Sequence, residues 1–220
     1  MDNIKVMERK HIIFDFDGTI ADSLRSGIDI FNSIHLKYKL PFITNVELEE
    51  FRSEGIFALK KKLRVPFYRV PFLIAELRQL ISGKIDGVHP FPGLPEFLRT
   101  LNAKGYHLSI LTSNSEENVR RFLENHNLSM FTHIHGGSGL FNKHRKLKQF
   151  MRTLGADRTN SIYIGDEVRD IVSARKLGLP MIAVTWGYNS KSVLLHFKPE
   201  FIVDSLEELY RLFLLNSSEE

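Results

Sequence analysis

Two aspartates separated by one residue, Asp15 and Asp17, follow the short apolar run His11–Phe14. On an extended chain, side chains two residues apart project the same way, so both carboxylates face one point. Close carboxylates repel, and either a cation or a shared proton can offset the cost. We expect Mg²⁺, since it prefers oxygen ligands and bridges to phosphate. Gly18 lets the backbone approach a ligand and offers its amide. Taken alone, the Asp-x-Asp pattern is more typical of a polar turn at a strand end.

A hydroxyl and several amides follow a second strand-like run, residues 106–111. Thr112 can donate its hydroxyl, and the N–H groups of Ser113, Asn114 and Ser115 open a predicted helix. Free N–H groups at a helix start make a ready anion site. The alternative is a plain helix cap.

A third polar group follows the apolar run 161–164 and contains Asp166, Glu167 and Asp170. Asp166 would complete a metal site with the first two aspartates. Asp170 lies one helical turn further on and could orient a metal-bound water, and Glu167 would act in the same outer layer. The alternative is acids that stabilise a helix N-terminus, by up to about 1 kcal/mol each.

A lysine, Lys143, begins the helical pattern that leads to the run 161–164. There it could bridge a carboxylate and a phosphate as a point charge. Lys146 and Lys148 stand close by, so the spacing leaves the choice among the three open. A solvated basic helix start is the other interpretation.

The elements that must position these residues alternate between strands and helices. Further strands are predicted at 132–135, 181–184 and 201–203, with helices at 95–104, 143–154, 168–177 and 205–214. Such alternation predicts right-handed crossovers and a parallel sheet covered on both faces. Ligands bind beyond the carboxyl ends of strands in such sheets, so every group above can reach one shared site.

The segment 22–88 differs, because its patterns are helical throughout. Thr44 and Glu47 form a capping-box pair, a helix is expected at 56–63, and another begins at Pro71 and ends at Gly83. A first helix presents one apolar face made of Leu24, Ile28, Phe31, Ile34 and Tyr38. We predict an α/β fold in which a doubly wound parallel sheet, residues 1–21 and 89–220, carries a small all-helical cap, residues 22–88, inserted after the first strand.

Composition narrows the classes of function. Lys and Arg number 30 against 26 Asp and Glu, and this net charge of +4 falls short of the basic stripe of a nucleic-acid binder. The absence of cysteine excludes disulfides, thiolate zinc sites and a cysteine nucleophile. No apolar run approaches the ~20 residues that span a bilayer, and Met1–Lys10 lacks the apolar stretch of a secretion signal, so we expect a cytoplasmic protein without membrane partners. The oligomeric state is not indicated.

The sequence resembles the haloacid dehalogenase-like hydrolases, in particular the phosphoglycolate-phosphatase-like branch. The segment 14–23, Phe-Asp-Phe-Asp-Gly-Thr-Ile-Ala-Asp-Ser, matches the first motif of that family. Segment 111–114 matches the second motif, Lys143 the third and segment 165–170 the fourth, while Thr185-Trp186-Gly187-Tyr188 resembles the stretch after the next core strand. Two positions depart from the pattern: His144 follows the lysine where proline is common, and Glu167 stands where Ser or Thr is frequent.

The resemblance implies a phosphatase that acts on a small phosphorylated metabolite with Mg²⁺. It assigns Asp15 as the nucleophile and Asp17 as general acid and base. Asp15, the main-chain carbonyl of Asp17, and Asp166 would hold the metal, while Gly18, Lys143 and the segment 112–114 would bind the phosphoryl group. The cap, as a lid, would select the substrate. Its basic residues would suit an anionic substrate, but a helix face that is simply exposed to solvent is the favoured interpretation of them. They are Lys60, Lys61, Lys62, Arg64 and Arg69.

Two other functions remain open from the sequence. A phosphomutase of the same family would return the phosphoryl group to a sugar phosphate. A non-catalytic regulator would keep the fold to bind a phospholigand, although such proteins usually lose one of the four motif carboxylates at 15, 17, 166 and 170, which are all present here.

Overall fold

The computed structural model describes residues 6–54, 69–137 and 143–215, and its centre is a six-stranded parallel sheet. The strands lie in the order β3-β2-β1-β4-β5-β6, which confirms the predicted doubly wound sheet. The direction of winding reverses between β1 and β4, the place where such folds bind ligands. The strands are β1 (His11–Phe14), β2 (His107–Leu111), β3 (Phe131–His135), β4 (Ser161–Gly165), β5 (Met181–Val184) and β6 (Phe201–Val203).

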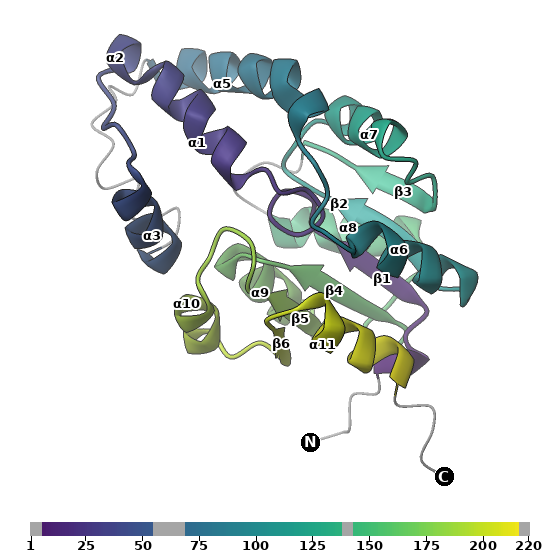
Figure 1. Ribbon diagram of the computed structural model, residues 1–220. Helices are drawn as coiled ribbons and strands as arrows, with labels where there is room; N and C mark the ends of the chain where they lie inside the picture. The colour runs from purple at the N-terminus through teal and green to yellow at the C-terminus, as the bar shows by residue number, and fades with distance from the viewer. Residues whose placement is uncertain (1–5, 55–68, 138–142, 216–220) are drawn as a thin grey trace.

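Helices cover both faces of the sheet (Figure 1). One face carries α6 (Leu94–Ala103), α7 (Glu116–Asn125) and α11 (Leu206–Tyr210), and the other carries α8 (Lys143–Thr153), α9 (Val168–Arg175) and α10 (Lys191–His196). The central strand β1 shows why both faces must be covered. Its Ile12 and Phe14 pack into the first layer and its Ile13 into the second, all of them buried. A 3₁₀ helix, η1 (Val6–Glu8), and a π-helical segment, η4 (Arg211–Leu215), lie near the two ends of the described chain.

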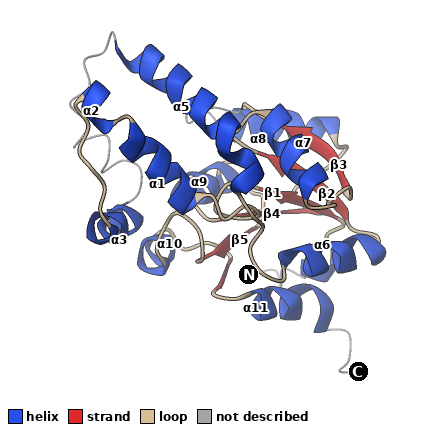
Figure 2. Cartoon of the chain, turned by 45° about the horizontal axis from the view of Figure 1, so that its top comes forward, coloured by secondary structure: helices blue, strands red, loops and turns tan. Residues whose placement is uncertain are grey.

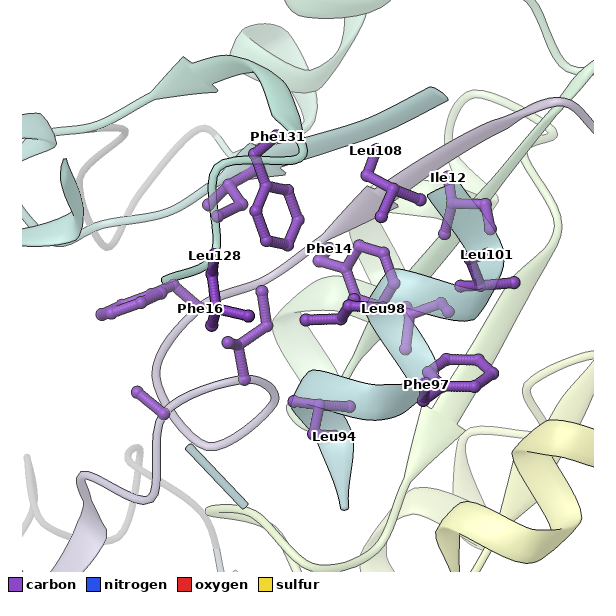
Figure 3. Packing of buried hydrophobic residues seen from close by; sticks show 14 of the residues in the cluster. Ile12, Phe14, Phe16, Leu94, Phe97, Leu98, Leu101, Leu108, Leu128 and Phe131 are labelled. Atoms are coloured by element: carbon purple, nitrogen blue, oxygen red, sulfur yellow. The ribbon is translucent and has the colours of Figure 1, made fainter. Parts of the chain in front are cut away.

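The core beneath β1 fixes the loop that follows it (Figure 3). Phe14 meets Phe131 edge to face with ring centroids 6.0 Å apart, and Phe16 meets Phe122 in the same way at 5.0 Å. Because neighbouring side chains on an extended chain alternate, burying Phe16 in this layer turns Asp15 and Asp17 away from it. The packing of the apolar core therefore sets the direction of the Asp15 and Asp17 carboxylates.

The described part of the cap, within 22–54 and 69–88, contains helices and no strand. Its elements are α1 (Leu24–Ser33), α2 (His35–Tyr38), α3 (Asn45–Glu54), α5 (Val70–Lys84) and the turn η3 (Ile85–Gly87). Helices α1 and α5 run side by side above the carboxyl ends of the strands (Figure 2). They enclose an apolar core separate from that of the sheet, which includes Leu24, Phe31, Ile34, Tyr38 and Leu73. The helix expected at 56–63 lies outside the described residues, as do Lys60, Lys61, Lys62 and Arg64, and the domain limits at 22 and 88 stay a prediction.

Local differences from the predicted elements have simple causes. The prediction that Gly83 ends its helix is wrong, since α5 continues to Lys84 and turns only at η3. The helix expected from Leu24 to Tyr38 divides at Ile34, whose backbone leaves the helical range. The short helix α10 was not anticipated, since six residues carry too little periodicity. No helix in the described ranges is long and apolar enough to cross a membrane.

Candidate active site

Three carboxylates meet where β1 and β4 end side by side. Asp15, Asp166 and Asp170 are at most 1% exposed, and one oxygen from each lies within 4.8 Å of the others. Asp170 thus belongs to the same cluster as the two aspartates predicted to bind metal, whereas the carboxylate of Asp17 does not. The register of β1 against β4, which pairs Phe14 with Ile164, brings the acidic segments that follow the two strands to the same edge.

Asp166 is held by neighbours on both sides. Its Oδ1 accepts a hydrogen bond of 2.8 Å from Thr19 Oγ1, and its Oδ2 accepts one of 2.7 Å from the backbone N–H of Tyr188. Burial, with the nearby carboxylates of Glu167 and Asp15, raises the pKa of Asp166 well above its usual value. A group of this kind gains from a cation that offsets the crowded negative charge.

Two glycines make room for Asp166. A Cβ on Gly18 or on Gly187 would lie 2.2 Å from Asp166 Oδ2, far inside van der Waals contact. Gly18 also has a φ of 78°, in the left-handed region that glycine enters freely. Its amide donates to Ala21 O at 2.9 Å, so this amide, predicted to bind phosphate, is engaged within the turn.

Lys143 bridges two of the carboxylates. Its Nζ lies 2.9 Å from Asp15 Oδ2 and 2.5 Å from Asp170 Oδ1, with the lysine side chain 2% exposed. Burial lowers the pKa of Lys143, but the two aspartates outweigh that effect and raise it above the usual value. Lys146 is only half-buried and Lys148 is exposed, so the structure places Lys143 alone of the three against Asp15.

Asp17 opens onto the cavity beside this cluster. Asn114 Nδ2 donates to its two oxygens at 3.1 and 3.4 Å, and Asn118 Nδ2 in turn donates to Asn114 Oδ1 at 2.9 Å. Burial and the neighbouring charge of Asp15 raise the pKa of Asp17. A raised pKa favours the protonated form that a general acid needs.

The hydroxyl residues predicted to bind phosphate follow β2 and adjoin Asn114 and the cavity. Thr112 is buried, and its Oγ1 accepts from the backbone N–H of Asn114 at 3.0 Å. Ser113 lines the cavity, and its Oγ accepts from Arg169 Nη2 at 3.4 Å. Ser115 caps α7 as predicted, by accepting from Asn118 N at 3.2 Å.

A cavity of about 520 Å³ separates this floor from the cap. Its polar lining includes Asp17, Ser113, Asn114, Glu167 and Arg169 from the core. Its cap side is largely apolar among the described residues and includes Ser26, Gly27, Ile30, Leu77, Ile81 and Ile85. A small organic molecule can therefore lie with a polar group on the sheet edge and its remainder against the cap.

The donor set fits a hard divalent cation. Asp15 Oδ1 is buried and accepts no hydrogen bond from the described residues, which leaves a lone pair free for a metal. The clustered ligands are carboxylate oxygens, the type that Mg²⁺ prefers, and the sequence contains no cysteine that could supply a thiolate ligand.

Several residues around the site were not singled out by sequence reasoning. Thr19, Asn118 and Arg169 all contact a predicted site residue, and Tyr188 supplies both the N–H for Asp166 and a hydroxyl 3.3 Å from Ser23 Oγ. All three of Thr19, Arg169 and Tyr188 stand inside segments that match the family's motifs, and Thr19 and Arg169 also lie close to acids in the sequence, which was the available signal. Asn118 had none, because its role depends on the start of α7 facing Asp17.

Comparison with known proteins identifies the family and the fold. The profile of the haloacid dehalogenase-like hydrolases matches residues 12–184. A phosphoglycolate phosphatase of Synechococcus elongatus is 29% identical over 199 residues, which cover 90% of this chain and 94% of that protein. A probable phosphatase, IndB, of Dickeya dadantii is 26% identical and covers 94% and 96%. Among solved structures, a predicted phosphatase from Clostridium acetobutylicum superposes with a TM-score of 0.81 at 24% identity, covering 92% of this chain and 97% of that one.

The chain belongs to the haloacid dehalogenase-like hydrolases. Within them it is a phosphatase of the phosphoglycolate-phosphatase-like branch.

Proposed function

We propose that this protein hydrolyses a small phosphomonoester with Mg²⁺, through an aspartyl phosphate on Asp15. The observation that carries the proposal is the buried cluster of Asp15, Asp166 and Asp170, which adjoins a cavity of about 520 Å³ lined by the neighbouring Asp17. The relatives named phosphoglycolate phosphatase support phosphoglycolate as the first substrate to test.

Asp15 and Asp17 divide the chemistry between them. An oxygen of Asp15 attacks phosphorus while the bond from phosphorus to the leaving oxygen breaks, and Asp17 gives that oxygen its proton. Water then attacks the phosphorus of the aspartyl phosphate and passes a proton to Asp17, and the bond to Asp15 breaks to free inorganic phosphate. The raised pKa of Asp17 and its hydrogen bond from Asn114 support this role.

The remaining residues hold charge and geometry. Asp15, Asp166 and the main-chain carbonyl of Asp17 would hold Mg²⁺, which supplies positive charge for the phosphoryl oxygens. Lys143 adds a fixed positive charge beside Asp15, and Asp170 keeps that lysine in place. Thr112 and Ser113 would supply hydroxyl donors to a phosphoryl group on Asp15. Glu167 meets Arg169 rather than the carboxylate cluster.

The experiment is a panel of phosphorylated metabolites, with released phosphate measured in Mg²⁺ and in EDTA. We expect phosphate release in Mg²⁺ only, and its loss in Asp15→Asn but not in Asp204→Asn, whose carboxylate pairs with Lys191 away from the site. Full activity of Asp15→Asn would show that the nucleophile is another group. Isomerised sugar phosphate in a coupled assay would mean a phosphomutase, and no release from any compound would favour a non-catalytic regulator.

A further inference from the structure

Arg169 lies at the floor of the cavity without a place in the mechanism above. It is the second residue of α9, and its side chain is 14% exposed. Its Nη2 lies 3.9 Å from Asp15 Oδ2, the same oxygen that Lys143 contacts. A guanidinium this deeply placed and always charged must have its donors satisfied to repay its lost hydration.

Two of its three nitrogens are satisfied. Glu167 Oε1 accepts from Arg169 Nε at 2.8 Å and lies 2.5 Å from Nη2, and Ser113 Oγ receives a longer bond from Nη2. The third nitrogen, Nη1, is buried and has no hydrogen-bond partner among the described residues. A buried donor left unpaired costs about 1–3 kcal/mol, so its persistence calls for an explanation, and a ligand is one.

The charges around Asp15 show which ligand fits. Five carboxylates surround the site, and the described cations beside them are Lys143 and Arg169; the carboxylates belong to Asp15, Asp17, Asp166, Glu167 and Asp170. Lys143 is committed to two of these acids. Arg169 therefore offers the spare donors, on a planar group whose geometry matches phosphate oxygens.

We propose that Arg169 donates from Nη1 to the phosphoryl group during its transfer to and from Asp15, and that Glu167 is the positioning residue that holds the guanidinium there. The inference rests on the function proposed above. It gives Glu167 a task distinct from metal binding: its carboxylate holds Nε and Nη2 of Arg169 and leaves Nη1 without a protein partner among the described residues.

The test uses Arg169→Gln and Arg169→Lys, with Arg175→Gln as the matched control. Arg175 is on the same helix and donates to the main-chain oxygens of Phe197 and Lys198, away from the cavity. The probes are para-nitrophenyl phosphate as substrate and inorganic phosphate as a competitive ligand, both with Mg²⁺.

We expect Arg169→Gln to lower kcat/KM by about 10²–10³-fold, as for loss of one donor to a transition-state oxyanion. We expect it to weaken inhibition by inorganic phosphate about 10–100-fold, the value of one charged hydrogen bond. Arg169→Lys should recover part of the phosphate affinity through its charge but less of kcat. Glu167→Gln should fall between wild type and Arg169→Gln, and Arg175→Gln should stay within about twofold of wild type.

A merely structural role would give a different pattern. If phosphate inhibition in Arg169→Gln, or in Arg169→Lys should the first variant fail to fold, equals that of wild type, the proposal is wrong, whatever the unfolding temperature does. Failure of the proposed function would look different, because wild type itself would then release no phosphate or Asp15→Asn would remain active.

Discussion

Replacing Lys143 by Met removes the cation between two buried carboxylates while keeping the length of an unbranched side chain. Lys143 Nζ lies 2.9 Å from Asp15 Oδ2 and 2.5 Å from Asp170 Oδ1, and none of the three side chains is more than 2% exposed. In the metal-free protein the variant leaves Asp170 without its cation and Asp15 with only the more distant Arg169, whose Nη2 lies 3.9 Å from Asp15 Oδ2. We expect it to lower the free energy of unfolding by about 3–5 kcal/mol, as for loss of one partner of a buried pair.

The share of this loss that falls on Asp170 can be bounded. Burial, opposed by Lys143, raises the pKa of Asp170 to about 6 from 3.8, which already costs about 3 kcal/mol at neutral pH. Without the lysine that pKa rises further, but Asp170 then takes up a proton. At pH 7 the total cost of burying Asp170 cannot exceed the free energy of protonating it, about 4 kcal/mol. The substitution therefore adds only about 1 kcal/mol at Asp170, and the rest of the loss of stability falls on Asp15.

Urea unfolding in EDTA at pH 5 and pH 8 measures both parts. Asp170 binds its proton more tightly in the folded state, so the stability from this group is present at low pH and is lost as pH rises from about 4 through about 6. In Lys143→Met the pKa of Asp170 is higher, so the stability that this group contributes continues to fall above pH 6. The gap between wild type and Lys143→Met should therefore be larger at pH 8 than at pH 5.

Lys146→Met is the control, because Lys146 is on the same helix but only half-buried. It should change the free energy of unfolding by no more than about 0.5 kcal/mol. The reasoning fails if Lys146→Met costs as much as Lys143→Met, or if the gap is as large at pH 5 as at pH 8.

Other predictions address the metal, the cap and the core. Mg²⁺ at about 100 times its dissociation constant should stabilise wild type by about 2.7 kcal/mol in thermal unfolding, but not Asp166→Asn. Gly187→Ala should weaken Mg²⁺ binding in calorimetry, because its Cβ would lie 2.2 Å from Asp166 Oδ2, whereas Gly83→Ala, with open space around it, should not. Phe97→Ala should cost about 3–5 kcal/mol in urea without changing KM, since Phe97 is fully buried in the sheet core. Arg52→Ala, which removes two hydrogen bonds to the core loop, should raise KM by weakening cap closure.

Much of the sheet could be predicted because its strands are apolar runs with no competing pattern. The strands at 11–14, 181–184 and 201–203 match the structure at both ends, and the others differ by a single residue. That the strands end at one common edge of the sheet followed from their parallel pairing alone. The helices were less certain at their ends, since Gly83 stays helical where a glycine often stops a helix.

The site was predictable where residues follow a strand and not where they meet through packing. Asp15 and Asp166 come together because β1 and β4 are neighbours. The choice of Lys143 over Lys146 depends on which side of α8 faces the sheet, and three basic residues in four positions, at 143, 145 and 146, hide that periodicity. The link from Asn118 through Asn114 to Asp17 depends on side-chain direction at the start of α7, which sequence spacing does not reveal.

The hydrogen bonds between Arg52 of the cap and the core loop 185–190 affect how the substrate range of this enzyme can evolve. Arg52 on α3 donates to the main-chain oxygens of Thr185 and Gly187, and its own carbonyl accepts from Ser190 N. The same short loop presents Tyr188 N to Asp166. A substitution that shifts α3 to admit a new substrate will thus also move the loop that seats Asp166. Substrate range and catalytic rate are therefore expected to change together under selection, and a gain in one will often require a compensating change between 185 and 190.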